Sequence, residues 1–305
     1  MSRSVPRYDV IVVGAGPAGL NAALLLGRCR RRVLICDTGR PRNAAAQALH
    51  GFLTDDGIAP AELLRRGREQ LRRYETVELR DIAVTNVTRA DDRFEVTLGD
   101  RTRFSSRRML LATGVVDLLP PIPGIEAFYG RSVHHCPYCD GWEVRDQPLA
   151  IYGRGASGRG LALELTAWSK DLVLCTDGPS GLTEEDLARL TRNGIAVREE
   201  RIARLEGNEG MLERIEFVDG AALPRRALFF STGERQHSDL PAKLGCDFTH
   251  HGAVRTTEYE ATNVPGLYVA GDASRRVQLA IVAAAEGAQA AFAINTALLK
   301  EDLAP

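Results

Sequence analysis

The chain has 305 residues, which is enough for two domains of ordinary size, each with its own core. Hydrophobic residues make up 44% and charged residues 26%, as is usual for globular domains. The 39 Lys and Arg residues nearly balance the 40 Asp and Glu residues, so charge provides no argument for a nucleic-acid or anionic-membrane partner. The sequence shows no run long enough to span a membrane and no secretory h-region, so we expect a cytoplasmic protein without membrane contact.

The first element is a short apolar, β-branched run, Tyr8–Val13, which predicts a buried parallel strand. It leads into a glycine-rich loop at 14–19, and a helix is expected through 22–26. Val33–Cys36 predicts the next strand, and Asp37 ends it about 20 residues after the loop, where an acid binds a ribose hydroxyl. Glycines let backbone N–H groups approach a pyrophosphate at the helix N-terminus. The pattern therefore predicts a dinucleotide-binding unit.

The same plan returns in the second half of the chain. Leu149–Tyr152 predicts a strand, 161–168 a helix and Leu172–Thr176 another strand, which Asp177 ends. Between the first strand and the helix lies a second glycine loop, formed by Gly153, Gly155 and Gly158. Each half also has a late strand that ends in Thr-Gly, at Thr113-Gly114 and at 232–233. The chain therefore contains two similar nucleotide-binding halves.

Between the two glycine loops lies a Cys-x-x-Cys pair, Cys136 and Cys139, preceded by His134 and His135. Such a pair holds zinc or shuttles electrons. Adjacent residues rarely aim at one metal, and the sequence contains no second Cys-x-x-Cys, so we expect no metal site. Two dinucleotide loops around the pair favour a dithiol that trades electrons with a bound cofactor, with the histidines as polar neighbours. Four other cysteines are scattered singly, and we expect each to be a small buried residue: Cys29, Cys36, Cys175 and Cys246.

After residue 240 the pattern of the second half ends. A turn and a short strand lead to Gly271-Asp272, and a long Ala-rich helix is expected at 277–299. The Pro-rich stretch 120–124 and the region 238–241 are typical of domain crossings. We therefore expect an α/β protein of two Rossmann-like, three-layer nucleotide-binding domains, the second inserted in the first. The expected boundaries are 1–117 with 243–305 for the first domain and 118–242 for the second.

These motifs resemble the thioredoxin reductase family of flavoproteins over nearly the whole chain. The resemblance implies FAD in the first domain, a smaller inserted domain of pyridine-nucleotide type that carries the redox dithiol, and a homodimer. By resemblance, Cys139 contacts the flavin, Cys136 attacks the substrate disulfide, and Asp140 protonates the leaving thiolate. A turn or helix-cap role is the alternative for Asp140. The residues that the resemblance places at FAD are Gly14, Gly16, Pro17, Ala18, Gly19, Asp37, Thr113, Gly114, Gly271, Asp272 and Gln278.

The chain departs from the family pattern after the second strand of the inserted domain. NADPH-dependent members carry a basic His-Arg-Arg cluster there, whereas residues 175–180 of this chain contain no Arg, Lys or His. Asp177 would repel a 2′-phosphate, which disfavours NADPH. NADH use remains open, with Asp177 on the ribose diol and the second glycine loop on the pyrophosphate. Loss of nicotinamide use remains open as well.

The leading interpretation is an FAD-dependent disulfide oxidoreductase that moves electrons between FAD, the Cys136–Cys139 pair and an external dithiol or disulfide. The partner is a thioredoxin-like protein or a small molecule. One alternative is an oxygen-using dithiol oxidase that closes disulfides in sulfur-containing natural products, and another is a ferredoxin-linked reductase. The alternative that is not an enzyme is a flavoprotein that senses redox state without catalytic turnover.

Overall fold

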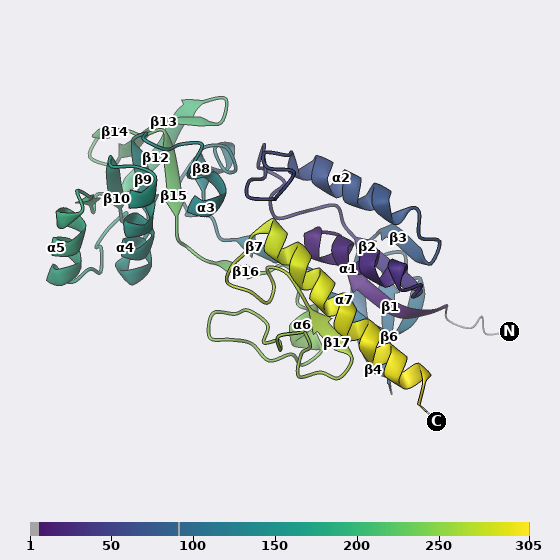
Figure 1. The fold of residues 1–305 in the computed structure, drawn as a ribbon. Coiled ribbons are helices and arrows are strands. Elements are labelled where there is room, and N and C mark those ends of the chain that lie inside the picture. The colour runs from purple at the N-terminus through teal and green to yellow at the C-terminus, as the bar shows by residue number, and fades with distance from the viewer. Residues whose placement is uncertain (1–5, 91, 305) are drawn as a thin grey trace. The chain divides into compact units, whose positions relative to one another are not determined.

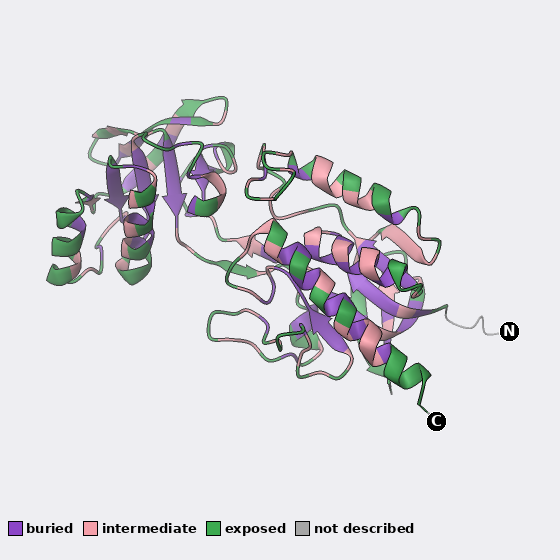
Figure 2. Ribbon diagram, viewed as in Figure 1, coloured by how far each residue is buried: buried purple, intermediate pink, exposed green. Residues whose placement is uncertain are grey.

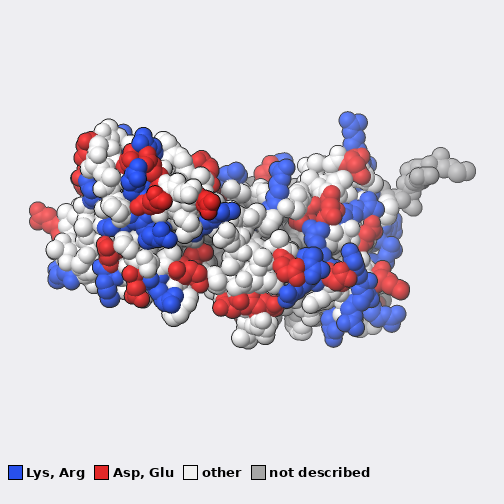
Figure 3. Space-filling model, turned by 90° about the horizontal axis from the view of Figure 1, so that it is seen from above, with Lys and Arg blue, Asp and Glu red and all other residues white. Residues whose placement is uncertain are grey.

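The computed structural model describes residues 6–90 and 92–304. The chain divides into two compact units, which we describe separately. Unit 1 contains the chain up to Arg42, Gly51–Val116 and the chain from Arg235 onward, and unit 2 contains Asn43–His50 and Asp117–Glu234. On the face drawn in Figure 3, basic and acidic side chains are interspersed, in keeping with the formal net charge of −1.

Unit 1 is built on a mostly parallel sheet of seven strands (Figure 1). Six of them follow the order β3-β2-β1-β6-β5-β4, and the seventh, β17, pairs in parallel with residues 109–111 of β6. Its central strands are buried because they are apolar on both faces. The strands are β1 (Arg7–Val13), β2 (Val33–Asp37), β3 (Val77–Asp81), β4 (Val84–Ala90), β5 (Arg93–Leu98), β6 (Arg103–Leu111) and β17 (Leu267–Val269). The helices are α1 (Pro17–Arg28), α2 (Pro60–Leu71), α6 (Leu240–Lys243) and α7 (Ala280–Asp302).

Helices α1 and α7 cover one face of this sheet and share a core with its strands (Figure 1). Their backbones approach closely, because a Cβ built on Gly287 would lie 2.0 Å from the carbonyl oxygen of Ala18. Only glycine allows this contact, which brings the start of α1 against α7. A second core fills the other face of the sheet, between its strands and the segment that contains α6.

Unit 2 repeats the parallel plan with the order β11-β10-β9-β15-β8, whose strands are largely buried (Figure 2). Helices α4 and α5 cover one face, and an antiparallel sheet β12-β13-β14 covers the other. The elements are η1 (Ile125–Ala127), β8 (Val133–His134), α3 (Pro137–Asp140), β9 (Leu149–Tyr152), α4 (Gly155–Glu164), η2 (Leu165–Ala167), β10 (Leu172–Cys175), α5 (Glu184–Arg192), β11 (Ala196–Arg198), β12 (Ile202–Asn208), β13 (Met211–Phe217), β14 (Ala222–Pro224) and β15 (Ala227–Phe230). The expected class, two α/β nucleotide-binding folds with three layers each, is confirmed.

The expected domain boundaries need correction at two places. The chain returns to unit 1 at Arg235 rather than at 243, because Leu240 is buried in a core of unit 1. The segment 43–50 belongs to unit 2, because Ala45 lies against Gly130 there. The two crossings pair with each other as β7 (Val115–Asp117) and β16 (Glu234–Gln236).

Two expectations about helices also need correction. Helix α4 begins at Gly155, inside the second glycine loop, and not near residue 161, because the loop closes directly into the first helical turn. Helix α7 is long and apolar enough, by length and composition, to cross a membrane, contrary to the expectation that no such run exists. In the structure, its residues Ala290, Ile294 and Leu298 are buried against α1 and the sheet, while Phe292 is exposed.

Candidate active site

The first glycine loop joins β1 to α1 through contacts that only glycine permits. Gly14 has φ +104°, and a Cβ there would lie 2.3 Å from the carbonyl oxygen of Ala112. A Cβ on Gly19 would lie 1.9 Å from the carbonyl oxygen of Gly14. These two glycines bring α1 close to the strands, which is the structural part of a dinucleotide-binding loop.

Gly16 has a different surrounding. A Cβ on Gly16 would meet no atom within 4 Å, so the backbone borders open space. No side chain caps the N-terminus of α1, where Pro17 occupies the first turn and Ala18 and Gly19 follow. An open glycine at an uncapped helix N-terminus fits the pyrophosphate of a dinucleotide.

The ends of the neighbouring strands complete this cradle. Asp37 follows β2 and accepts hydrogen bonds from the N–H groups of Ala15 and Gly39, both at 3.1 Å. Arg68 also binds this carboxylate, at 2.5 Å. The hydroxyl oxygen of Thr113 is buried without a hydrogen-bond partner, and Gly114 beside it has φ +66°. A buried polar atom without a partner is the kind of group that a bound cofactor satisfies.

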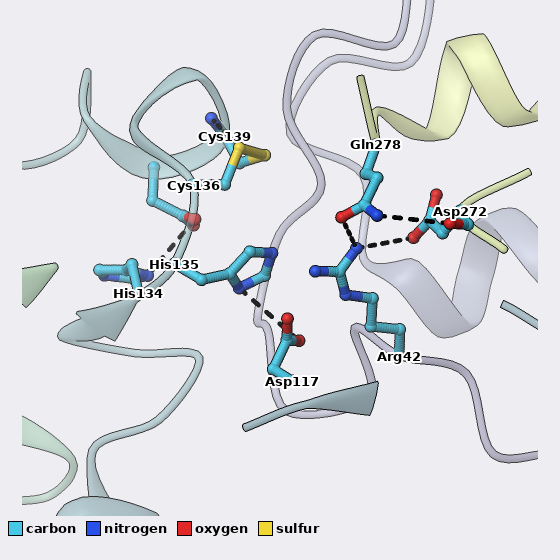
Figure 4. The surroundings of a disulfide bond; sticks show 9 residues. Arg42, Asp117, His134, His135, Cys136, Cys139, Asp272 and Gln278 are labelled. Carbon is cyan, nitrogen blue, oxygen red and sulfur yellow. Dashed lines mark hydrogen bonds and ion pairs between the residues drawn. A yellow bond between two sulfur atoms is a disulfide. The ribbon is translucent and has the colours of Figure 1, made fainter. Parts of the chain in front are cut away.

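Three side chains from distant parts of the sequence meet at the start of α7 (Figure 4). Arg42 donates to Asp272 at 2.9 Å and to Gln278 at 2.6 Å. The amide of Gln278 donates to the backbone oxygen of Asp272 at 3.3 Å. The sequence had predicted Asp272 and Gln278 but missed Arg42, since no local pattern marks an arginine whose partners lie more than 200 residues away.

A buried network lies behind Gly271. The N–H of Gly271 donates to Glu286 at 2.7 Å, and Arg275 binds both Glu286 at 2.9 Å and Glu260 at 2.5 Å. Burial raises the pKa of Glu286 to about 7, against the opposing effects of the Gly271 N–H and Arg275. Burial also raises the pKa of Glu260. The network therefore holds the Gly271-Asp272 turn with one arginine between two carboxyl groups.

The residues of unit 1 together fit FAD. The glycine loop and the N-terminus of α1 would hold its pyrophosphate, Asp37 the adenosine ribose and Asp272 the ribityl side. The buried hydroxyl of Thr113 provides a further hydrogen-bonding group at the end of β6.

In unit 2, Cys136 and Cys139 form a disulfide (Figure 4). Cys136 is the N-cap of the short helix α3, and the backbone N–H of Cys139 donates to its sulfur at 3.1 Å. This bond stabilises negative charge on Cys136 once the disulfide is reduced. Both cysteines are half-buried, so an external sulfur can reach them.

Residues next to the disulfide in the chain take part in two histidine–carboxylate pairs. Nδ1 of His134 lies 3.4 Å from Asp140. Nδ1 of His135 lies 3.8 Å from Asp117 (Figure 4). The hydroxyl of Tyr129 donates to Asp117 at 2.6 Å, which holds this buried carboxylate in place. The sequence had predicted the histidines as polar neighbours but did not identify Asp117, which comes from the crossing strand β7.

The comparisons with known proteins agree with this geometry. Residues 8–287 match the model of the pyridine nucleotide-disulphide oxidoreductase family. The chain belongs to this family. A probable thioredoxin reductase of Arthroderma benhamiae is 31% identical over 300 residues, which cover 88% of this chain and 74% of that protein.

Two solved structures are also similar to the chain. A putative thioredoxin reductase TrxB from Bacillus anthracis is 35% identical with a TM-score of 0.92, and the match covers 97% of this chain and all of that one. The structure of HlmI is 38% identical with a TM-score of 0.92, covering 97% and 94%. The expected resemblance to thioredoxin reductases is therefore confirmed, and the protein is a flavin-dependent oxidoreductase that acts on disulfides.

Membership of the pyridine nucleotide-disulphide oxidoreductases implies a pyridine nucleotide beside FAD, and the second glycine loop is where it would bind. Gly153 and Gly158 are in close contact there, since a Cβ on Gly158 would lie 2.5 Å from the carbonyl carbon of Gly153. Asp177, however, directs a carboxylate oxygen to the N–H of Ile202 at 2.8 Å. This bond places one oxygen of Asp177 in the attachment of β12, and the ribose role of Asp177 stays a prediction.

The remaining cysteines differ in exposure. Cys36, Cys175 and Cys246 are buried as expected, but Cys29 is exposed because it ends α1 at the surface. Burial raises the pKa of both Cys36 and Cys175 to about 12, which makes them inert toward disulfides. In the part of the chain that the structure describes, no three His, Cys, Asp or Glu side chains are grouped as metal ligands.

Proposed function

We propose that this pyridine nucleotide-disulphide oxidoreductase exchanges electrons between FAD, the Cys136–Cys139 pair and an external thioredoxin-type or small-molecule dithiol/disulfide. The observation that carries the proposal is the half-buried disulfide whose neighbours in the chain take part in two histidine–carboxylate pairs. FAD, when bound in unit 1, supplies or accepts the two electrons that this pair gains or loses.

The two sulfurs have different roles in this proposal. In the reducing direction, the Cys136 thiolate attacks the substrate disulfide and forms a mixed disulfide, and the departing substrate thiolate takes a proton. Cys139 then loses its proton and attacks Cys136, which restores the Cys136–Cys139 disulfide and releases the second substrate thiolate. The N–H of Cys139 supports Cys136 as the attacking sulfur because it stabilises the thiolate there. Oxidation of a dithiol follows the same steps in reverse.

Proton transfer requires an acid and a base beside the sulfurs. Asp140 follows Cys139 directly and lies beside His134, and His135 precedes Cys136 and lies beside Asp117. We propose that Asp140 protonates the leaving thiolate, with His134 holding its carboxylate in position. His135, oriented by Asp117, is a second group able to move a proton near Cys136.

Exposed aromatic side chains next to the disulfide support an external partner. Tyr138, between the two cysteines, is 69% exposed, and Trp142 is 64% exposed. The ring of Tyr138 stands edge-on to Trp168 at 5.5 Å, which holds it in place. Exposed aromatic groups of this kind suit the binding of a protein surface or a small cyclic disulfide.

The test is an anaerobic titration of the FAD-loaded protein with dithiothreitol. We expect the flavin to bleach in the wild type, and its rate to fall at least about 100-fold in Cys136→Ser and in Cys139→Ser. Cys139→Ser should also trap a mixed disulfide between Cys136 and thionitrobenzoate. Cys29→Ser is the matched control, because Cys29 is exposed but lies in unit 1. Undiminished bleaching in Cys139→Ser contradicts the proposal.

A second candidate function is an oxygen-using dithiol oxidase, in which two substrate thiols become a disulfide and oxygen becomes hydrogen peroxide. The observation that favours it is the absence of Lys, Arg and His from residues 175–180. One peroxide released per dithiol consumed, without added nicotinamide, supports it. Rapid anaerobic bleaching of the flavin by NADPH counts against it.

We also propose a homodimer formed through unit 1. Phe292 on α7 is 65% exposed, and its ring lies 6.4 Å from the exposed ring of Tyr259. Exposed aromatic pairs of this kind favour burial against a second copy. Sedimentation analysis of the wild type and of Phe292→Glu tests it, and a monomeric wild type overturns it.

A further inference from the structure

Hydrogen bonds within this chain cross the second glycine loop. Arg154 stands between the first two glycines, and its Nε donates to the carbonyl oxygen of Thr176 at 2.6 Å. Its Nη2 donates to the carbonyl oxygen of Asp177. The guanidinium therefore crosses from the loop to the end of β10. In a dinucleotide-binding unit, the adenosine ribose lies in this position.

One N–H at the helix N-terminus behind the loop is also engaged. The N–H of Gly155, at the start of α4, donates to the carbonyl oxygen of Ser180 at 2.8 Å. In a bound dinucleotide, the pyrophosphate would lie against this end of the helix. A Cβ on Gly16 of the first loop would meet nothing within 4 Å, and one on Gly155 would meet only the oxygen of Gly181, at 3.9 Å, so the contrast lies in the Ser180 oxygen that the N–H of Gly155 binds. The two loops share a sequence pattern but differ in what lies against them.

The segment 176–181 that covers the second loop is held at several points. The backbone N–H of Thr176 donates to the backbone oxygen of Arg198 at 2.9 Å, and that of Gly178 to the backbone oxygen of Glu199 at 2.8 Å. The backbone N–H of Ser180 donates to the carboxylate of Glu199 at 2.9 Å. The bond from Ile202 to Asp177 adds a fourth point. Opening the loop for a nucleotide would break several of these bonds together, which makes the closed arrangement stable.

We infer that unit 2 does not hold a pyridine nucleotide in its glycine loop, because Arg154 and the segment 176–181 close it. The inference rests on the proposed function in one respect only, since it excludes a pyridine nucleotide bound in unit 2 as the electron donor of that exchange. The guanidinium of Arg154 lies across the ribose position. The carbonyl oxygen of Ser180 takes the place of a phosphate oxygen at the N–H of Gly155.

The test is binding, measured by calorimetry on the FAD-loaded full chain with NADPH, NADH and ADP-ribose as probes. ADP-ribose is included because it carries the ribose and pyrophosphate without redox chemistry. We expect no saturable binding in the wild type, with any dissociation constant weaker than about 1 mM. Arg154→Gly removes the side chain that crosses the ribose position, and its ADP-ribose affinity should be at least about tenfold higher than that of the wild type.

Arg159→Gly is the matched control. Arg159 lies on α4, the helix that Arg154 directly precedes, but pairs with Asp186 of α5. Its removal should therefore bring no gain in ADP-ribose affinity. Submillimolar binding of any probe to the wild type overturns the inference, and so does the absence of a gain in Arg154→Gly. Bleaching by dithiothreitol, measured on the same samples, reports on the dithiol alone, so failure of the proposed function is recognised separately.

Discussion

The carboxylate of Glu286 accepts a hydrogen bond from the backbone N–H of Gly271 at 2.7 Å, and Glu286 is buried. This bond ties α7 to the glycine that precedes Asp272. Arg275 lies between Glu286 and Glu260, so one positive charge serves two carboxyl groups. A proton held by Glu286 relieves this imbalance, which links the turn at Gly271 to pH.

Glu286→Gln should make stability less dependent on pH. Burial raises the pKa of Glu286 from 4.5 to about 7, so its contribution to stability is fully present below about pH 4.5 and is lost as the pH rises through about 7. Glutamine keeps an oxygen for Gly271 but cannot ionise. Between these limits we expect the wild type to lose on the order of 3 kcal/mol more free energy of unfolding than the variant. Urea denaturation of both proteins at about pH 4.5 and at about pH 7, with the same FAD concentration, measures the two losses in free energy of unfolding. Equal losses in wild type and variant would show that Glu286 does not titrate between these pH values.

Substitutions in the first glycine loop should separate folding from FAD binding. Gly19→Ala places a methyl group 1.9 Å from the Gly14 oxygen, so α1 must shift, at a cost of about 3 kcal/mol. Gly16→Ala meets no protein atom and should fold normally but hold FAD at least about tenfold more weakly, because the methyl group occupies the pyrophosphate position. Melting temperature and bound flavin after gel filtration distinguish the two effects.

Gly160→Ala is the control for both glycine variants. It lies within α4, where a Cβ would meet nothing within 4 Å, so stability should stay equal or rise by up to about 1 kcal/mol. Full flavin content in Gly16→Ala would contradict the assignment of the open space to the pyrophosphate.

Arg42→Ala should weaken FAD binding by about tenfold, because Asp272 and Gln278 lose the cation that holds them. Arg42→Lys keeps the charge but cannot bridge both partners with the same geometry, so we expect partial recovery. Fluorescence titration of the apoprotein with FAD measures the affinity. Arg40→Ala is the control, since Arg40 is exposed two residues earlier in the same loop. An unchanged dissociation constant in Arg42→Ala would exclude a positioning role.

Alkylation should divide the cysteines by their surroundings. In the oxidised native protein, iodoacetamide at about pH 8 should label Cys29 but not Cys36 or Cys175, whose pKa of about 12 leaves almost no thiolate. Reduction with dithiothreitol should add labels at Cys136 and Cys139. Peptide mass spectrometry reads out each site. Labelling of Cys175 before Cys29 would mean that unit 2 opens in solution.

The sequence by itself predicted the strand, glycine loop and helix that begin each half, but not the strands β3–β5 and β11–β14. Apolar runs that end at glycine predicted β1 and β9, and one that ends at Asp37 predicted β2, each within one or two residues, because strands buried on both faces and tight turns leave a local pattern. The Cys-x-x-Cys pair and the two glycine loops were visible for the same reason, since their chemistry depends on residues close together in the chain.

Only the tertiary structure decided which residues serve each site. Arg42 meets Asp272, and Asp117 meets His135, through folding that brings separate segments together. The two glycine loops look alike in sequence, and a Cβ would find room at both Gly16 and Gly155, but in the structure the N–H of Gly155 is bound to Ser180. A glycine pattern specifies the backbone that can approach a phosphate, whereas the segments packed against that backbone determine whether there is room for one.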